Sequence, residues 1–93
     1  MIRNTAITES EILESIIAAK DATFSPEAAE ALLKLKFRPR ETNRIRSLLR
    51  KNNAGTIDAE GRIALEKYLR VGQFLDLLHA KARLTLTKRA RSR

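Results

Sequence analysis

The chain has 93 residues, of which 43% are hydrophobic and 32% charged, with three Gly, two Pro and no Cys. A chain of this length forms a single domain, and the lack of cysteine excludes disulfides and thiolate metal sites. The formal net charge of +8 favours a polyanionic partner, nucleic acid first.

The composition predicts an all-α fold. Leu, Ile, Ala, Glu, Lys and Arg dominate the chain, and most of these are good helix formers. Alternating patterns of period two, which are typical of strands, are nearly absent. No stretch approaches the ~20 apolar residues that span a bilayer, and the amino terminus lacks the apolar core of a signal peptide. We therefore expect a cytoplasmic protein with no membrane partner.

Charge is segregated along the chain. Residues 1–31 hold two basic and six acidic side chains, whereas residues 32–53 hold eight basic and one acidic. Residues 54–80 are nearly neutral, with three basic and four acidic side chains, and residues 81–93 hold six basic and none acidic. The sequence therefore has an acidic head, a basic middle and a basic tail.

Residues 1–37 are predicted to form acidic N-terminal helices. Thr8 and Glu11 have the spacing of a capping box, so a first helix begins near Thr8. Ser25 before Pro26 predicts a second start, since serine caps a helix and proline suits its first position. We expect this second helix to continue to about Lys36, with a short extended segment over residues 33–37 as the alternative.

Residues 38–87 are predicted to form a long antiparallel helical hairpin. Its first helix begins at Pro39 and continues to about Lys51, and Gly55 supplies the open backbone that ends a helix. Asp58 caps the last helix, which extends to about Thr87. The short loop makes the two helices antiparallel neighbours. Residues 1–87 are thus one helical domain, and residues 88–93 a basic tail that we expect to be disordered.

Four leucines of the last helix depart from its amphipathic pattern. They lie on the polar side of the helical wheel and need a second packing partner, either the N-terminal helices or another chain. These residues are Leu65, Leu69, Leu77 and Leu84. Homodimerisation through Leu69, Leu77 and Leu84 is one arrangement that would bury them.

A search for catalytic groups predicts no enzyme. His79 is the only histidine, so a site with several histidine ligands is excluded, and its place at the border of the apolar face predicts a packing role. No glycine-rich loop follows a strand to cradle phosphates. We expect no catalytic residue, no metal site and no cofactor.

Arginine-rich segments are the candidate nucleic-acid-binding residues, because guanidinium groups make bidentate contacts with phosphate. Two alternatives remain open: a solvated helix whose arginines pair with the acidic N-terminal helix, or an acidic protein partner. No aromatic residues alternate with the charges, so stacking of single-stranded bases is not supported. The candidates are Arg38, Arg40, Arg44, Arg46, Arg50 and Lys51, and, in the tail, Lys88, Arg89, Arg91 and Arg93.

A family resemblance covers residues 36–87. It is carried by the turn Arg50-Lys51-Asn52-Asn53-Ala54-Gly55-Thr56-Ile57-Asp58-Ala59-Glu60-Gly61-Arg62, then Tyr68-Leu69-Arg70-Val71-Gly72 and Leu77-Leu78-His79-Ala80-Lys81-Ala82-Arg83. This pattern resembles small uncharacterised bacterial helical proteins, frequent in planctomycetes and cyanobacteria, with a Gly-Thr-Leu-Thr-Pro-Glu-Glu type of turn before a long helix.

The resemblance implies an antitoxin-like role, since such reading frames often lie beside those of HNH endonucleases. Here Asp58-Ala59-Glu60-Gly61 replaces the usual Thr-Pro-Glu-Glu, which keeps a capping side chain but loses the acidic capping-box partner. The shared motif is a turn and a helix cap, so no functional residue is carried over. Residues 1–31 lie outside the pattern.

Two functional hypotheses follow, with a third behind them. The first is an antitoxin-like protein that neutralises or scaffolds a partner protein, such as a nuclease toxin, through helix packing. Its acidic first helix would mimic nucleic acid over a basic cleft. The partner-binding candidates are Ile12, Leu13, Ile16 and Ile17, together with Leu69, Leu77 and Leu84. The alternative for the first four is that they complete the core.

The second hypothesis is a nucleic-acid-binding regulator of DNA or RNA, which uses the arginine-rich helix and the tail. Its binding would weaken steeply with salt. The third is a structural helical subunit of a larger assembly.

Overall fold

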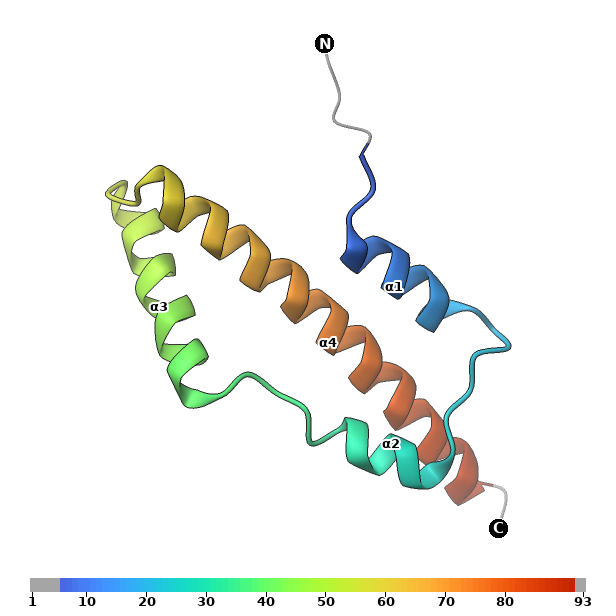
Figure 1. Ribbon diagram of the computed structural model, residues 1–93. Coiled ribbons are helices and arrows are strands. Elements are labelled where there is room, and N and C mark those ends of the chain that lie inside the picture. Colours follow the sequence, from blue (N-terminus) through green and yellow to red (C-terminus); the bar gives the residue numbers. More distant parts are fainter. Residues whose placement is uncertain (1–5, 92–93) are drawn as a thin grey trace.

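The computed structural model describes residues 6–91, apart from the side chains of Arg89 and Arg91, and within them it contains four helices and no strand. In chain order these are α1 (Glu9–Ala18), α2 (Pro26–Leu32), α3 (Pro39–Ala54) and α4 (Ala59–Arg91). The all-α prediction, with shorter helices before a long last one, is confirmed (Figure 1). Within the described part of the chain, no helix has the length and apolar character needed to cross a membrane.

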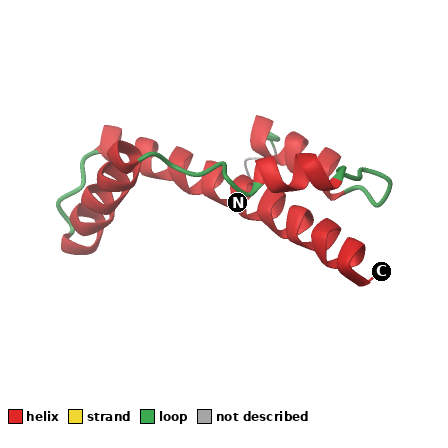
Figure 2. Cartoon of the chain, turned by 90° about the horizontal axis from the view of Figure 1, so that it is seen from below, coloured by secondary structure: helices red, strands yellow, loops and turns green. Residues whose placement is uncertain are grey.

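Helix α4 is the common packing partner of the other three. Each short helix contacts α4, and no two of the short helices described contact each other. Helices α1 and α2 lie on either side of the C-terminal half of α4, and α3 lies beside its N-terminal end (Figure 1). Figure 2 shows the same chain from below. The principal-axis extents of the molecule are 54 × 35 × 16 Å, so it is flat.

This flat arrangement leaves an unusually small core. The radius of gyration is 16.7 Å, whereas a compact chain of this length has about 12 Å. The accessible surface is 7547 Å², about 2100 Å² more than the ~5400 Å² expected for this mass. The buried apolar side chains of the described residues are Ala29, Leu48, Leu65, Leu78 and Ala82.

The predicted starts of α1 and α2 are confirmed by their caps. The backbone N–H of Glu11 donates to Thr8 Oγ1, and the N–H of Thr8 donates to Glu11 Oε1, both at 3.1 Å. At α2, the N–H of Ala28 donates to Ser25 Oγ at 3.1 Å, directly before Pro26. The reciprocal pair at α1 and the single bond at α2 satisfy N–H groups that have no partner inside the helix.

The turn between α3 and α4 brings the two helices close together. Gly55 ends α3 with a φ of 74°, a left-handed backbone that glycine adopts without strain. Asp58 caps α4 as predicted, since its Oδ1 accepts from the Gly61 N–H at 2.7 Å. A Cβ on Gly61 would lie 2.9 Å from that oxygen and 3.3 Å from Leu48 Cδ2. The small residue at position 61 therefore permits the contact that buries Leu48.

Helix α2 ends at Leu32, so the prediction that it continues to Lys36 is wrong. Residues 33–34 form a turn, and residues 35–38 are neither helix nor strand. This segment is held by long-range contacts: the Phe37 ring meets Tyr68 edge to face at a centroid distance of 6.0 Å. The Leu35 carbonyl accepts from His79 Nε2 at 2.7 Å. These contacts with α4 replace the hydrogen bonds that a longer helix would make.

The hairpin of α3 and α4 has the predicted chain order, but its arms diverge. From the turn, α3 swings away from α4 in both Figure 1 and Figure 2. Phe37, just before α3, lies beside Tyr68 and 3.7 Å from where a Cβ on Gly72 would be. The segment before α3 thus covers a part of the α4 surface that α3 itself would cover if the two helices packed along their whole length.

The C-terminal end of α4 also differs from the prediction. The helix continues to Arg91, so residues 88–91, expected as part of a disordered tail, are helical. Lys, Arg and Ala are good helix formers and no Gly or Pro interrupts them, so local propensity favours continuation. Residues 92–93 lie outside the described part.

Substitution of Leu48 tests the packing of this small core, because the Leu48 side chain is 1% exposed whereas that of the adjacent Leu49 is 38% exposed. We expect Leu48→Ala to lower the free energy of unfolding by about 2–5 kcal/mol. Leu49→Ala, the matched control, should cost about 1 kcal/mol or less. Urea titration followed by far-UV circular dichroism measures both. Equal losses would show that α3 does not pack through Leu48.

Candidate functional site

The apolar stripe of α1 does not face α4. The half-buried side chains of this helix are Ser10, Glu14 and Ile17, and no residue of α1 is buried. Three of the four predicted stripe residues remain exposed: Ile12 by 45%, Leu13 by 46% and Ile16 by 57%. We call Ile12, Leu13 and Ile16 the outer face of α1. The alternative that they complete the core does not hold for these three, while Ile17 is partly covered.

Negative charge surrounds this outer face. Glu9 and Glu11 are exposed on the first turns of α1, and Glu14 follows on its next turn. Helix α1 carries these three acidic side chains and no basic one. Carboxylates near a helix N-terminus also match the positive end of its dipole. The outer face is therefore an apolar patch in an acidic setting.

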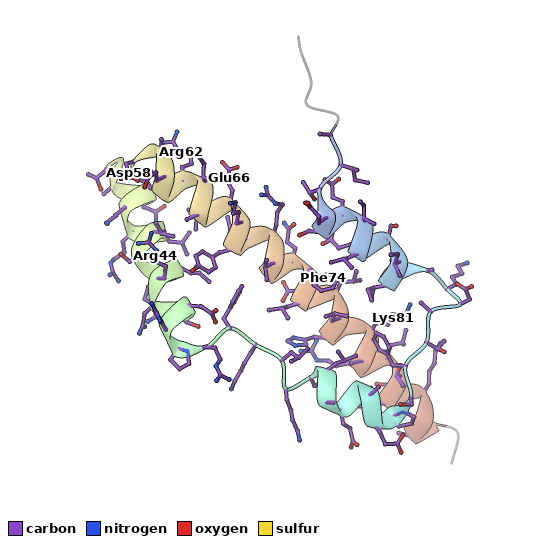
Figure 3. All side chains as sticks on the ribbon, viewed as in Figure 1. Arg44, Asp58, Arg62, Glu66, Phe74 and Lys81 are labelled. Carbon is purple, nitrogen blue, oxygen red and sulfur yellow. The ribbon has the colours of Figure 1, made fainter. Side chains whose placement is uncertain are left out.

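A single lysine of α4 holds the other end of α1. Lys81 Nζ donates to the carbonyl oxygens of Ile17 and Ala19, the latter at 2.7 Å. These carbonyls belong to the last turn, where helix hydrogen bonds run out, and α1 has no basic residue of its own there. The ammonium group supplies the cation that the negative end of a helix favours. Figure 3 shows Lys81 reaching from α4 toward the end of α1.

The sequence placed Lys81 in a basic segment without assigning it this contact. Its two acceptors are 62 and 64 residues away in the chain. No local spacing in the sequence indicates a hydrogen bond over that separation, so only the tertiary structure shows this contact.

A groove of about 660 Å³ lies where the link between α1 and α2 crosses α4. Ala19 and Phe24 line it from the link, and Leu77, Ala80 and Leu84 line it from α4. Leu77 is half-buried here, whereas Leu84 remains 52% exposed at the same groove. The N-terminal segment therefore covers part of the leucines that the wheel placed on the polar side.

The other two leucines of that set have different surroundings. Leu65 is 5% exposed and lies one turn after Gly61, on the part of α4 near α3. Leu69 is 48% exposed. Leu69, Leu77 and Leu84 thus do not form one continuous exposed surface, because the link between α1 and α2 partly covers Leu77.

The structure separates the basic candidates into two groups. Within the described part of the chain, α1 and α3 make no contact, so the interpretation that the acidic helix neutralises the α3 arginines is wrong. Lys88 lies at the far end of α4 from α3; the side chains of Arg89 and Arg91, and the whole of Arg93, lie outside the described residues. The exposed group at α3 comprises Arg38, Arg40, Arg44, Arg46, Arg50 and Lys51.

His79 has a structural contact in this arrangement. A carbonyl oxygen only accepts, so the Nε2 of His79 carries the proton that it donates to Leu35 O at 2.7 Å. The bond ties the segment before α3 to α4, which is the packing role expected from the sequence.

Comparison of the chain with protein-family models, with curated proteins and with solved structures finds no match. The surfaces themselves therefore carry the functional argument: an acidic, apolar outer face on α1 and an arginine-rich face on α3.

Replacing Lys81 tests how α1 is held. In Lys81→Met the two carbonyls lose a charged donor, and each such bond contributes about 1.5–3 kcal/mol. We expect amide hydrogen exchange in residues 9–18 to become at least about a hundredfold faster, while α2 and α3 keep their protection. Arg83→Met, which removes the same charge from an exposed position two residues on, is the control. Unchanged exchange in α1 with Lys81→Met would contradict the anchoring role.

Proposed function

We propose that this chain is a non-catalytic, antitoxin-like binding protein that neutralises or scaffolds a partner protein, with α1 as its docking helix. The observation that carries the proposal is the outer face of α1: Ile12, Leu13 and Ile16 are 45–57% exposed on a helix that buries no residue. A helix that contributed only to this fold would turn such a stripe toward α4.

The outer face has the pattern of helix-in-groove recognition. Ile12 and Ile16 are four residues apart and Leu13 and Ile16 three apart, so all three project from one side of two successive turns. Fully burying an isoleucine or leucine side chain contributes about 1.5–3 kcal/mol. Three such anchors on one side of a helix suit docking into an apolar groove of a partner protein.

The charges around α1 favour a basic protein as the partner. Glu9 and Glu11 flank the anchors on a helix that carries three acidic side chains and no basic one. A positively charged cleft, such as that of a nuclease, attracts this helix as it attracts a phosphate backbone. Binding there would cover the cleft and exclude nucleic acid, which is an antitoxin-like mode of inhibition.

Capture of the partner from a native lysate tests the docking face. The immobilised chain is incubated with lysate digested by nuclease, and we expect it to retain a basic protein. Ile12→Ala/Ile16→Ala should weaken binding of that purified protein at least about tenfold, since truncated anchors at an interface centre cost more than 1 kcal/mol each. Alanine favours helix, so α1 stays folded in the variant.

Leu49→Ala/Ile63→Ala is the matched control, because these two aliphatic side chains are 38% and 55% exposed on α3 and α4. It should bind as the unchanged chain does. Equal weakening by both double variants, retention of an acidic protein, or loss of all captured protein after nuclease digestion would overturn the proposal.

The antitoxin-like part has its own test, with growth as the readout. Expression of the captured protein alone should arrest its host, and co-expression of this chain should restore growth. The Ile12→Ala/Ile16→Ala variant should fail to restore it while Leu49→Ala/Ile63→Ala succeeds. If the captured protein is harmless when expressed alone, the neutralising role is overturned and a scaffolding role remains.

A further inference from the structure

The outward side of α3 has an ordered charge pattern. On a helix of 3.6 residues per turn, Arg40, Arg44 and Lys51 form one row and Arg46 and Arg50 a second. All five are exposed. The buried Leu48 and half-buried Ile45 lie roughly opposite the strip between the two rows, so this strip points away from α4, while the row of Arg40, Arg44 and Lys51 borders the side of α3 that packs on α4.

Small polar side chains separate the two rows. Asn43 and Ser47 are four residues apart and lie between them on the wheel. Asn43 Oδ1 accepts from Arg46 Nη1 at 3.4 Å, which leaves the amide NH₂ of Asn43 as a donor. A helix face with basic side chains along both edges and short polar side chains at its centre suits a duplex groove, because phosphates border each side of the groove and base edges form its floor.

A cavity beside α3 extends this surface. Arg38, Arg40 and Arg44 line a groove of about 850 Å³ together with Tyr68 of α4. Glu41 also lines the groove, but its Oε1 is engaged by the Arg38 backbone N–H at 2.7 Å. Figure 3 shows Arg44 on α3. The groove thus offers three guanidinium groups and a phenol hydroxyl to an anionic strand.

The position of α3 gives access to a duplex. Its arm diverges from α4 (Figure 1), and its 16 residues form a rod about 24 Å long. A helix of about 10–12 Å diameter enters the B-DNA major groove, which is about 12 Å wide.

We propose that α3 binds duplex DNA, lying in the major groove with its two basic rows on the bordering phosphates and one backbone strand in the groove between α3 and Tyr68. Only Asn43 and Ser47 face base edges among the residues between the rows, so sequence preference is weak and backbone contacts dominate affinity. This surface is separate from the outer face of α1, since α1 and α3 do not touch.

The same geometry selects against other nucleic acids. The major groove of A-form RNA is deep and too narrow for side chains to read. Single strands are held by successive aromatic stacking platforms, whereas Tyr68 is the one aromatic side chain among those that line the groove beside α3. The full chain should therefore bind a DNA duplex more tightly than the RNA duplex or the single strand of the same sequence.

Fluorescence anisotropy with a labelled DNA duplex over a salt series tests the proposal. Arg40→Gln/Arg44→Gln removes two phosphate contacts, each of which contributes about 0.9 to the slope of log affinity against log salt. We expect the slope to fall by about 1.8 and the affinity at about 0.1 M salt to fall by about 60-fold. Circular dichroism should be unchanged, because both side chains are exposed.

Lys67→Gln/Arg83→Gln is the control with the same loss of charge from exposed positions on α4. A small change in this variant with a large one in Arg40→Gln/Arg44→Gln supports the α3 site. Equal changes in both double variants would show that the effect depends on net charge alone and would overturn the proposed α3 site. Equal or tighter binding of the RNA duplex or single strand, or no binding of the DNA duplex at about 0.1 M salt, would also overturn it. Ile12→Ala/Ile16→Ala should bind DNA as the unchanged chain does.

Discussion

The packing of three short helices on one long helix is the constraint on which the rest of the structure depends. Because α1, α2 and α3 each contact α4 and not one another, no side chain is enclosed from all sides by several helices, as in a bundle. Burial is confined to lines of contact along α4, and Leu48 is the only large side chain of the described residues that is fully enclosed. In a flat molecule of this kind, each short helix packs on α4 along one side and exposes its other sides to solvent. Exposed apolar residues therefore follow from the architecture itself.

The three attachments to α4 differ in kind, and that difference bears on function. Helix α3 is held by close backbone approach at Gly61, and the segment before it by the Phe37–Tyr68 contact. Helix α1 has no buried residue, and its C-terminal end depends on the ammonium group of Lys81. Elements with few buried contacts open at low free-energy cost. A partner that binds the outer face of α1 therefore acts on a helix that has no buried residue.

The segregation of charge in the sequence becomes a separation in space. The acidic residues of α1 lie beside the C-terminal half of α4, whereas the arginines of α3 are distributed along the arm that diverges from the N-terminal half of α4 (Figure 1). Since α1 and α3 share no contact, the two charge groups do not neutralise each other. The two proposed surfaces, one for a basic protein and one for duplex DNA, are distinct and can be occupied together.

The sequence by itself determined the helix class, the starts of the helices and the turn, because these depend on neighbours three or four residues apart. The Thr8–Glu11 box, the Ser25 and Asp58 caps and the left-handed Gly55 are all of this kind. The sequence also identified the apolar set on α1 but left open whether it completes the core. Only the tertiary structure decided that its outer face is exposed, that α2 stops at Leu32, that the hairpin arms diverge and that Lys81 caps α1. Each of these depends on contacts between residues far apart in the chain, and helical periodicity defines the faces of a helix without specifying which face meets a neighbour.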